Sequence, residues 1–203
     1  MIDSLRWRIL SLQGALIVVF AFLAGFAFWG ANFTHSQVHD QLIAQKIAMP
    51  DKATLSPKEY SQADITALAP YSGSMLDNGN KAKAYADHYI QVHLNAMGMT
   101  YSQASAKYMA LTIGQKLPAT NPKVQALGNL RQALFMGTTL RGSLLQAYAW
   151  DTIGSYAFFA AIGLTFAALV VLIAFLFELV VVPRREGVVR HEQLVGRPIS
   201  VAS

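Results

Sequence analysis

The sequence predicts an all-α integral membrane protein, with two transmembrane helices and a helical extracytoplasmic domain between them. Two long apolar runs lie near the two ends of the chain, and the sequence between them carries helix caps, turn residues and helical periodicity. No stretch alternates between apolar and polar residues for long enough to indicate a sheet. The chain has no cysteine, so the domain has to be stable through packing, without disulfides or cysteine-bound metal.

The first apolar run, Ile9–Gly30, contains no charged residue. A hydrocarbon core of ~30 Å needs about 20 apolar helical residues, so this run is long enough to span a bilayer. A cleaved signal peptide is the alternative, because Arg6 and Arg8 precede the run. The run is too long for that role, and bulky residues stand where a cleavage site needs small ones. We therefore expect a retained transmembrane helix over residues 9–31.

The domain between the spans, residues 32–152, is expected to contain five helices, at residues 34–48, 56–68, 81–97, 102–113 and 122–150. The first continues the span outward until Pro50. The second starts at Ser56–Glu59, where serine, proline and glutamate form a capping pattern. A turn at Asp77–Asn80 precedes the third helix, which Gly98 ends.

The fifth helix opens at Pro122, and no breaker stronger than a single glycine separates it from the second apolar run, Ile153–Phe177. This run is also long enough to cross a bilayer. We expect the second transmembrane helix over residues 153–182.

Basic residues near the spans predict the orientation. Arg6 and Arg8 precede the first span, and Arg184 and Arg185 follow the second. Both termini, residues 1–8 and 183–203, are therefore expected in the cytoplasm, with the protein in the plasma membrane. The net charge of +5 forms no basic stripe interleaved with aromatic residues, which argues against nucleic acid as a partner. The expected partners are membrane lipids and other integral membrane proteins, or a second copy of the chain.

Small residues on the two spans indicate how such partners are recognised. Ala21 and Gly25 in the first span, and Gly163 and Ala167 in the second, have the small-xxx-small spacing that allows helices to pack closely. These pairs are expected to join the spans either to each other or to helices of another protein.

A candidate metal site lies in the third helix. His93 and Met97 are four residues apart on one helix face, with His88 nearby, and imidazole with thioether suits copper. The alternative is that His88 faces water while Met97 fills a gap in the core. A second histidine pair, His35 and His39, has i,i+4 spacing and could bind zinc together with a carboxylate such as Asp40, the alternative being that both histidines are simply hydrated.

Two further charged residues are candidates for structural or partner contacts. Arg141 falls inside an apolar helical stripe, so we expect it either to pair with a carboxylate, Asp87 being one candidate, or to extend to lipid headgroups. Glu178 ends the second span and is expected to form a salt bridge with Arg184 or Arg185 at the interface.

The sequence contains no nucleophile elbow, no HExxH motif, no phosphate loop and no nucleotide fingerprint. We therefore expect neither enzymatic activity nor a cofactor. The favoured function is a non-catalytic accessory or structural subunit of a larger membrane complex, of a respiratory or cell-envelope type. The alternative is an extracytoplasmic module that binds a lipid, a quinone or copper.

Three segments, at residues 41–50, 85–94 and 99–102, resemble a group of actinobacterial two-span membrane proteins of unknown function. Members of this group share an AQKI…P exit from the first span, a YAD-x-I-x-x-H helix and a TY start before the return to the membrane. They are often labelled aromatic ring-opening dioxygenases, a label that this chain's residues do not support. The usual GKTY is Gly98–Tyr101 here, with methionine replacing lysine. The resemblance implies a membrane location and an actinobacterial source.

Overall fold

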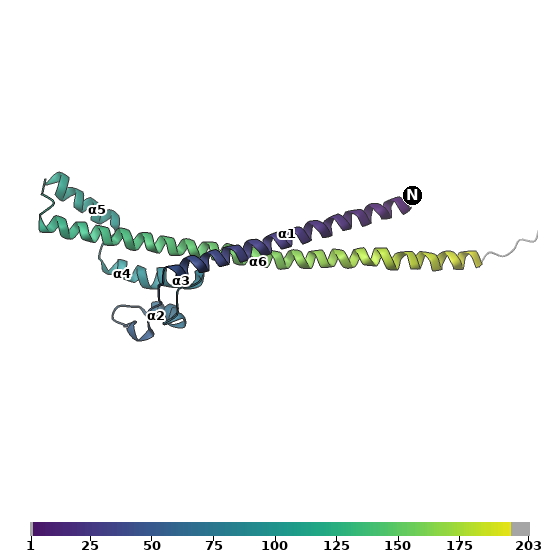
Figure 1. The fold of residues 1–203 in the computed structure, drawn as a ribbon, viewed down its shortest axis with the longest axis horizontal. Coiled ribbons are helices and arrows are strands. Elements are labelled where there is room, and N and C mark those ends of the chain that lie inside the picture. The colour runs from purple at the N-terminus through teal and green to yellow at the C-terminus, as the bar shows by residue number, and fades with distance from the viewer. Residues whose placement is uncertain (1, 196–203) are drawn as a thin grey trace, which may run out of the picture. The chain divides into compact units, whose positions relative to one another are not determined.

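The structure, a computed structural model, describes the backbone of residues 2–195 and the side chains of residues 5–181 (Figure 1). Within this part of the chain the regular elements are all helical. Tertiary contacts divide the chain into two units. We call the residues up to Ala31 and from Tyr156 onward the apolar unit, and Asn32–Ser155 the central unit.

Two long helices, α1 (Ile2–Ala44) and α6 (Pro122–Val195), contribute to both units. Each is long and apolar enough to cross a membrane. Almost none of either apolar stretch is buried within the chain, whereas a core helix of a soluble protein would be mostly buried. The helix that begins at Pro122 continues without interruption into the second apolar run, so α6 is a single element.

The end of α1 differs from the sequence prediction. The helix was expected to reach residue 48, but it ends at Ala44 because Lys46 adopts a φ of 52°, in the left-handed region that terminates helices. Ala48 then forms an isolated antiparallel bridge with Met75, made by two backbone hydrogen bonds of 2.8 and 2.9 Å. This bridge fixes the chain between α1 and α3.

The second helix also starts later than predicted. Its cap is Ser61 rather than Ser56, and α2 runs from Gln62–Leu68. Asp64 completes a capping box, because the backbone N–H of Ser61 donates to its carboxylate while its own N–H donates to Ser61 Oγ. Short 3-10 turns, η1 (Lys52–Thr54) and η2 (Ala69–Tyr71), flank this region.

The predicted third helix is present, but it is divided by a π-helical turn. It consists of α3 (Gly79–Tyr85), η3 (Ala86–Ile90) and α4 (Gln91–Ala96). The side chain of Asn78 caps α3, so the helix starts two residues before the predicted residue 81. Gly98, with a φ of 74°, follows its end as expected.

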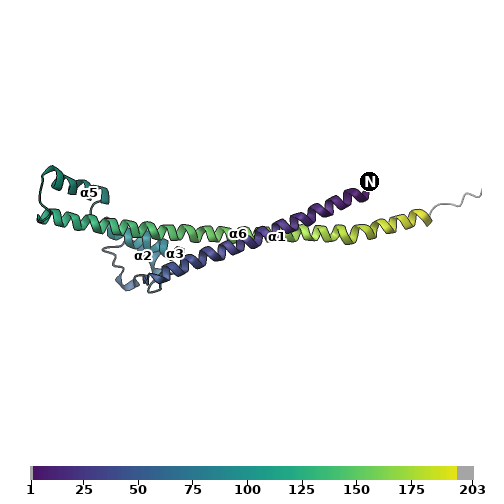
Figure 2. The same ribbon diagram turned by 45° about the horizontal axis from the view of Figure 1, so that its top comes forward.

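The fourth predicted helix comprises α5 (Tyr101–Met109) and the π-helical turn η4 (Ala110–Gly114). Figures 1 and 2 show α5 lying alongside the beginning of α6. The guanidinium of Arg131 stacks on the ring of Tyr108 at 4.2 Å, and the rings of Tyr101 and Phe135 are 5.7 Å apart. These contacts anchor α5 on α6.

The core of the central unit is formed by buried apolar residues from α1, α2, α3, η3 and α6 and from the segments that connect α1, α2 and α3. They include Val38, Leu42, Met49, Leu55, Leu68, Leu76, Ala82, Ala86, Ile90 and Leu144. Val38 and Leu42, four residues apart, lie on one face of α1.

The carboxylate of Asp151 connects three helices of the central unit. Its Oδ1 lies 2.7 Å from Nδ1 of His35 on α1, and its Oδ2 accepts a 3.2 Å hydrogen bond from the backbone N–H of Gly79 at the start of α3. Three residues later on α6, Gly154 faces the side chains of Thr34 and His35 so closely that a Cβ atom would overlap them. Glycine is therefore required at this crossing.

We expect Gly154→Ala to destabilise the chain by about 1–3 kcal/mol, because the added methyl group overpacks the α1–α6 contact. Gly142→Ala is the matched control, because it lies on the same helix and a Cβ there meets no atom within 4 Å. The control should be neutral or stabilising by up to about 1 kcal/mol. Thermal unfolding of both variants in detergent measures the difference. If Gly154→Ala and Gly142→Ala melt at the same temperature, the close contact between α1 and α6 at Gly154 is contradicted.

Candidate functional site

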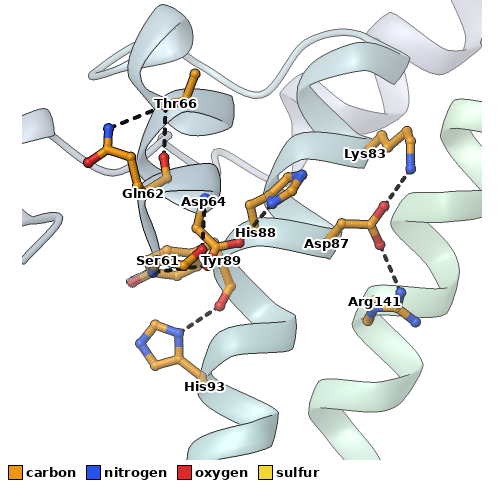
Figure 3. Close-up of polar contacts among 10 residues, drawn as sticks. All are labelled: Ser61, Gln62, Asp64, Thr66, Lys83, Asp87, His88, Tyr89, His93 and Arg141. Atoms are coloured by element: carbon orange, nitrogen blue, oxygen red, sulfur yellow. Dashed lines mark hydrogen bonds and ion pairs between the residues drawn. The ribbon is translucent and has the colours of Figure 1, made fainter. Parts of the chain in front are cut away.

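Charged and aromatic side chains gather around the π-helical turn η3. In this turn Gln91 donates its backbone N–H to the carbonyl of Ala86, one residue further back than in an α-helix. Turns of this type are frequent at functional sites. Two successive residues of η3, Asp87 and His88, contact different neighbouring helices (Figure 3).

Asp87 joins η3 to α6. Arg141 donates from Nη2 to Oδ1 of Asp87 at 2.8 Å, and Lys83 donates from Nζ to Oδ2 at 2.5 Å. Burial alone would raise the pKa of the Asp87 carboxyl, but the hydrogen bonds from Lys83 and Arg141, together with their charges, outweigh it and lower the pKa. The structure therefore contains the ion pair for which the sequence offered Asp87 as a candidate.

Gly137 lies one helical turn before Arg141 and faces Leu94 of α4. A Cβ at Gly137 would lie 2.8 Å from Cδ2 of Leu94, so the leucine side chain fills the space that the glycine leaves. This contact brings α4 close to α6 beside the ion pair.

His88 joins η3 to α2. Its Nδ1 lies 2.8 Å from Oδ1 of Asp64, the residue that also caps α2 through Ser61 (Figure 3). Burial would raise the pKa of the Asp64 carboxyl, but the hydrogen bonds from Ser61 and His88 outweigh it and lower the pKa. One carboxylate therefore caps a helix and binds a second helix to it.

His93 on α4 lies within a group of aromatic rings. Its Nδ1 donates to the backbone carbonyl of Tyr89 at 2.8 Å, and its Nε2 lies 3.5 Å from Oε1 of Glu59. The rings of Tyr60 and Tyr89 are stacked at 6.2 Å. Burial, followed by the charge of Glu59 and the neighbouring tyrosines, raises the pKa of Tyr60 to about 12, so this phenol stays protonated at neutral pH.

The three residues proposed for copper do not share one set of contacts. His88 is directed to Asp64, His93 to the Tyr89 carbonyl, and Met97 is the residue that caps the end of α4. Among the residues that the structure describes, no group of three or more histidine, cysteine or acidic side chains is arranged to hold a metal ion. The second pair is also engaged, with His35 next to Asp151 and His39 Nδ1 3.1 Å from the Asp77 carbonyl.

At Glu178, the contact found within the described residues is made by the backbone carbonyl. Arg6 donates from Nη2 to the peptide carbonyl of Glu178 at 2.9 Å, within the apolar unit. The predicted partners Arg184 and Arg185 have side chains outside the described part of the chain.

Sequence reasoning missed Asp151, which connects α1, α3 and α6. Its partner His35 is 116 residues away in the sequence, and no motif links the two. The one available signal was a carboxylate directly before an apolar run, where an unpaired charge would be costly.

The apolar unit contains a groove of about 700 Å³ between α1 and α6. Small residues, among them Ala21, Ala24, Gly25, Ala161 and Ala168, make up much of its wall, with Phe28 and Phe158 also lining it at a ring distance of 6.1 Å. A Cβ at Gly25 or at Gly163 would meet no atom within 4 Å. The apolar stretches of α1 and α6 therefore do not use these glycines to pack against each other.

Comparisons with protein-family models, with curated proteins and with solved structures return no match to this chain.

We expect the stability of the protein to fall in acid because the pKa values of Asp64 and Asp87 are lowered by folding. A carboxyl with a lowered folded pKa adds stability above its usual value of 3.8, and that stability is lost as the pH falls through the folded pKa. Melting temperatures between pH 7 and pH 3 measure this loss.

Asp87→Asn should lower the free energy of unfolding at neutral pH by about 1.5–3 kcal/mol, the contribution of hydrogen bonds to a charged group. The variant should also lose less stability than the unmodified chain as the pH falls. Asp40→Asn is the control, because Asp40 is exposed on α1. If both variants melt like the unmodified chain at every pH, Asp87 has no such role.

Proposed function

We propose that this protein is a non-catalytic accessory or structural subunit of a larger assembly in the plasma membrane. Its termini lie in the cytoplasm and its central unit lies outside. Its partners are transmembrane helices of other integral membrane proteins or of a second copy, together with the surrounding lipids.

The observation that carries this proposal is the small-residue surface of the apolar unit. Helices in lipid associate by close packing at glycine and alanine, since apolar surface alone gives no advantage over lipid tails. Ala21 and Gly25 line a groove that the chain's own side chains leave open, and Gly163 is also open. Such surfaces suit a helix from another subunit.

The polar residues of the central unit support the same proposal. Within the described residues, His35, His88 and His93 are each directed to a carboxylate or a carbonyl of the same unit, and Asp64, Asp87 and Asp151 each contact two partners. These side chains hold helices together. The resemblance to actinobacterial two-span proteins agrees with a membrane subunit and stays a prediction.

The orientation can be tested with single cysteines, because the chain has none. Ser102→Cys, at an exposed position of α5, should react with a membrane-impermeant maleimide on intact cells. Leu5→Cys, exposed near the start of α1, should react only after the cells are permeabilised. The reverse pattern would contradict the proposed orientation.

Partner binding can be tested by filling the groove. Ala21→Leu combined with Gly25→Leu should reduce the recovery of co-purifying membrane proteins, or of a tagged second copy, by about tenfold or more in mild detergent. Val19→Leu is the control, because Val19 is 49% exposed and does not line the groove. An unmodified chain that purifies only as a monomer, without partners, would refute the proposal.

A further inference from the structure

A second groove, distinct from the one in the apolar unit, lies in the central unit between α4, α5 and α6. It has a volume of about 630 Å³. Its polar lining consists mainly of hydroxyl, amide and guanidinium groups, from Gln91, Asn95, Thr100, Gln103, Thr138 and Arg141. The volume is in the range of sites for small organic ligands.

Arg141 has donor capacity that the protein does not use. A guanidinium has five N–H donors. The contact to Asp87 is the one hydrogen bond that the described residues give Arg141, and its Nε is enclosed without a partner. The side chain is 32% exposed and lines the groove, so the remaining Nη hydrogens are available to a bound molecule.

The amides of the groove also present donors. The Oε1 atom of Gln103 accepts from the backbone N–H of Thr100 at 2.9 Å, which leaves the NH₂ group of Gln103 free to donate. In the same way Oδ1 of Asn95 accepts a hydrogen bond from Nε2 of Gln91 at 2.7 Å, which leaves the NH₂ group of Asn95 free to donate. These contacts occupy the side-chain oxygens of Gln103 and Asn95 and leave their NH₂ donors, whereas Gln91 uses its donor and keeps its Oε1 as an acceptor.

The charge of the groove is positive. None of the described residues that line it is acidic. Arg141 and Lys83 share the single carboxylate of Asp87, so this group of three residues has a net charge of +1. A groove with a surplus of donors and of positive charge favours an anion over a cation or a neutral ligand.

We propose that this groove binds the anionic group, a carboxylate or a phosphate, of a polar small molecule. The anion contacts the guanidinium of Arg141 and the amide NH₂ groups of Asn95 and Gln103. An isolated phosphate fills only a small part of 630 Å³, so the rest of the ligand extends over Tyr101, a residue that is 42% exposed. This site is independent of the groove proposed for partner helices.

The decisive variant is Gln103→Glu. Glutamate keeps the Oε1 that accepts from Thr100, so the cap of α5 and the fold are retained. The variant removes one NH₂ donor and places a negative charge next to the anion. Gln125→Glu is the matched control, because Gln125 is an exposed residue of α6 outside the groove.

The experiment uses the full chain in detergent and measures binding of inorganic phosphate and of acetate by calorimetry, against chloride at equal ionic strength. Saturable binding to the unmodified chain, weakened about tenfold or more by Gln103→Glu and unchanged by Gln125→Glu, supports the proposal. Arg141→Gln should weaken binding similarly, and its melting temperature shows whether the variant is folded.

A second set of measurements separates a free anion from a lipid headgroup. The chain is placed in nanodiscs of phosphatidylcholine with or without phosphatidylglycerol, and the melting temperature is recorded. A stabilisation by phosphatidylglycerol that Gln103→Glu abolishes, without binding of the free ions, assigns the anion to a lipid headgroup. If Gln103→Glu has no effect in either set of measurements, the proposed site is refuted.

Discussion

The central unit depends on the carboxylate of Asp151. It reaches His35 on α1 and the first backbone N–H of α3 from one position on α6, so it fixes three helices with two oxygen atoms. A chain without cysteine has no covalent link to replace this contact. The glycines at 79 and 154 belong to the same arrangement, since a side chain at either would displace Asp151 or the α1 residues Thr34 and His35. The polar contact and the close packing therefore require each other.

The π-helical turn η3 extends this arrangement to the remaining helices. Asp87 reaches α6 and its neighbour His88 reaches α2, so a single turn joins both partners. Asp64 has a comparable double role, because the same carboxylate caps α2 and contacts His88. The half-buried carboxylates of Asp64, Asp87 and Asp151 are each matched by hydrogen-bond donors, which limits the cost of removing them from water. The charged residues of the unit are in this sense part of its packing.

Local signals in the sequence were enough to predict the presence of the helices and the two apolar runs, because periodicity and helix-breaking residues act over a few residues. Competing local signals were harder to rank. Ser56 and Ser61 both begin a capping pattern, and the structure forms the capping box at Ser61 with Asp64, a residue that also contacts His88, 24 residues away. The left-handed conformation of Lys46 that ends α1 at Ala44 is followed by a bridge between Ala48 and Met75, and no local rule indicates either feature. Arg141 was identifiable because a charge inside an apolar stripe needs a partner, whereas Asp151 lies at the edge of such a stripe and gave no comparable signal.

Arg141 shows how structure and binding can share one residue. Its contact with Asp87 balances part of its charge, and the guanidinium keeps further N–H donors that this one hydrogen bond does not use. Asp87 carries one negative charge and pairs with two cations, Lys83 and Arg141, so one positive charge remains unbalanced. A ligand that neutralises the remaining charge would also strengthen the α4–α6 contact, because binding to the folded state alone stabilises it. The ion pair between Arg141 and Asp87, which joins η3 to α6, therefore also holds the guanidinium at the groove proposed to bind an anion.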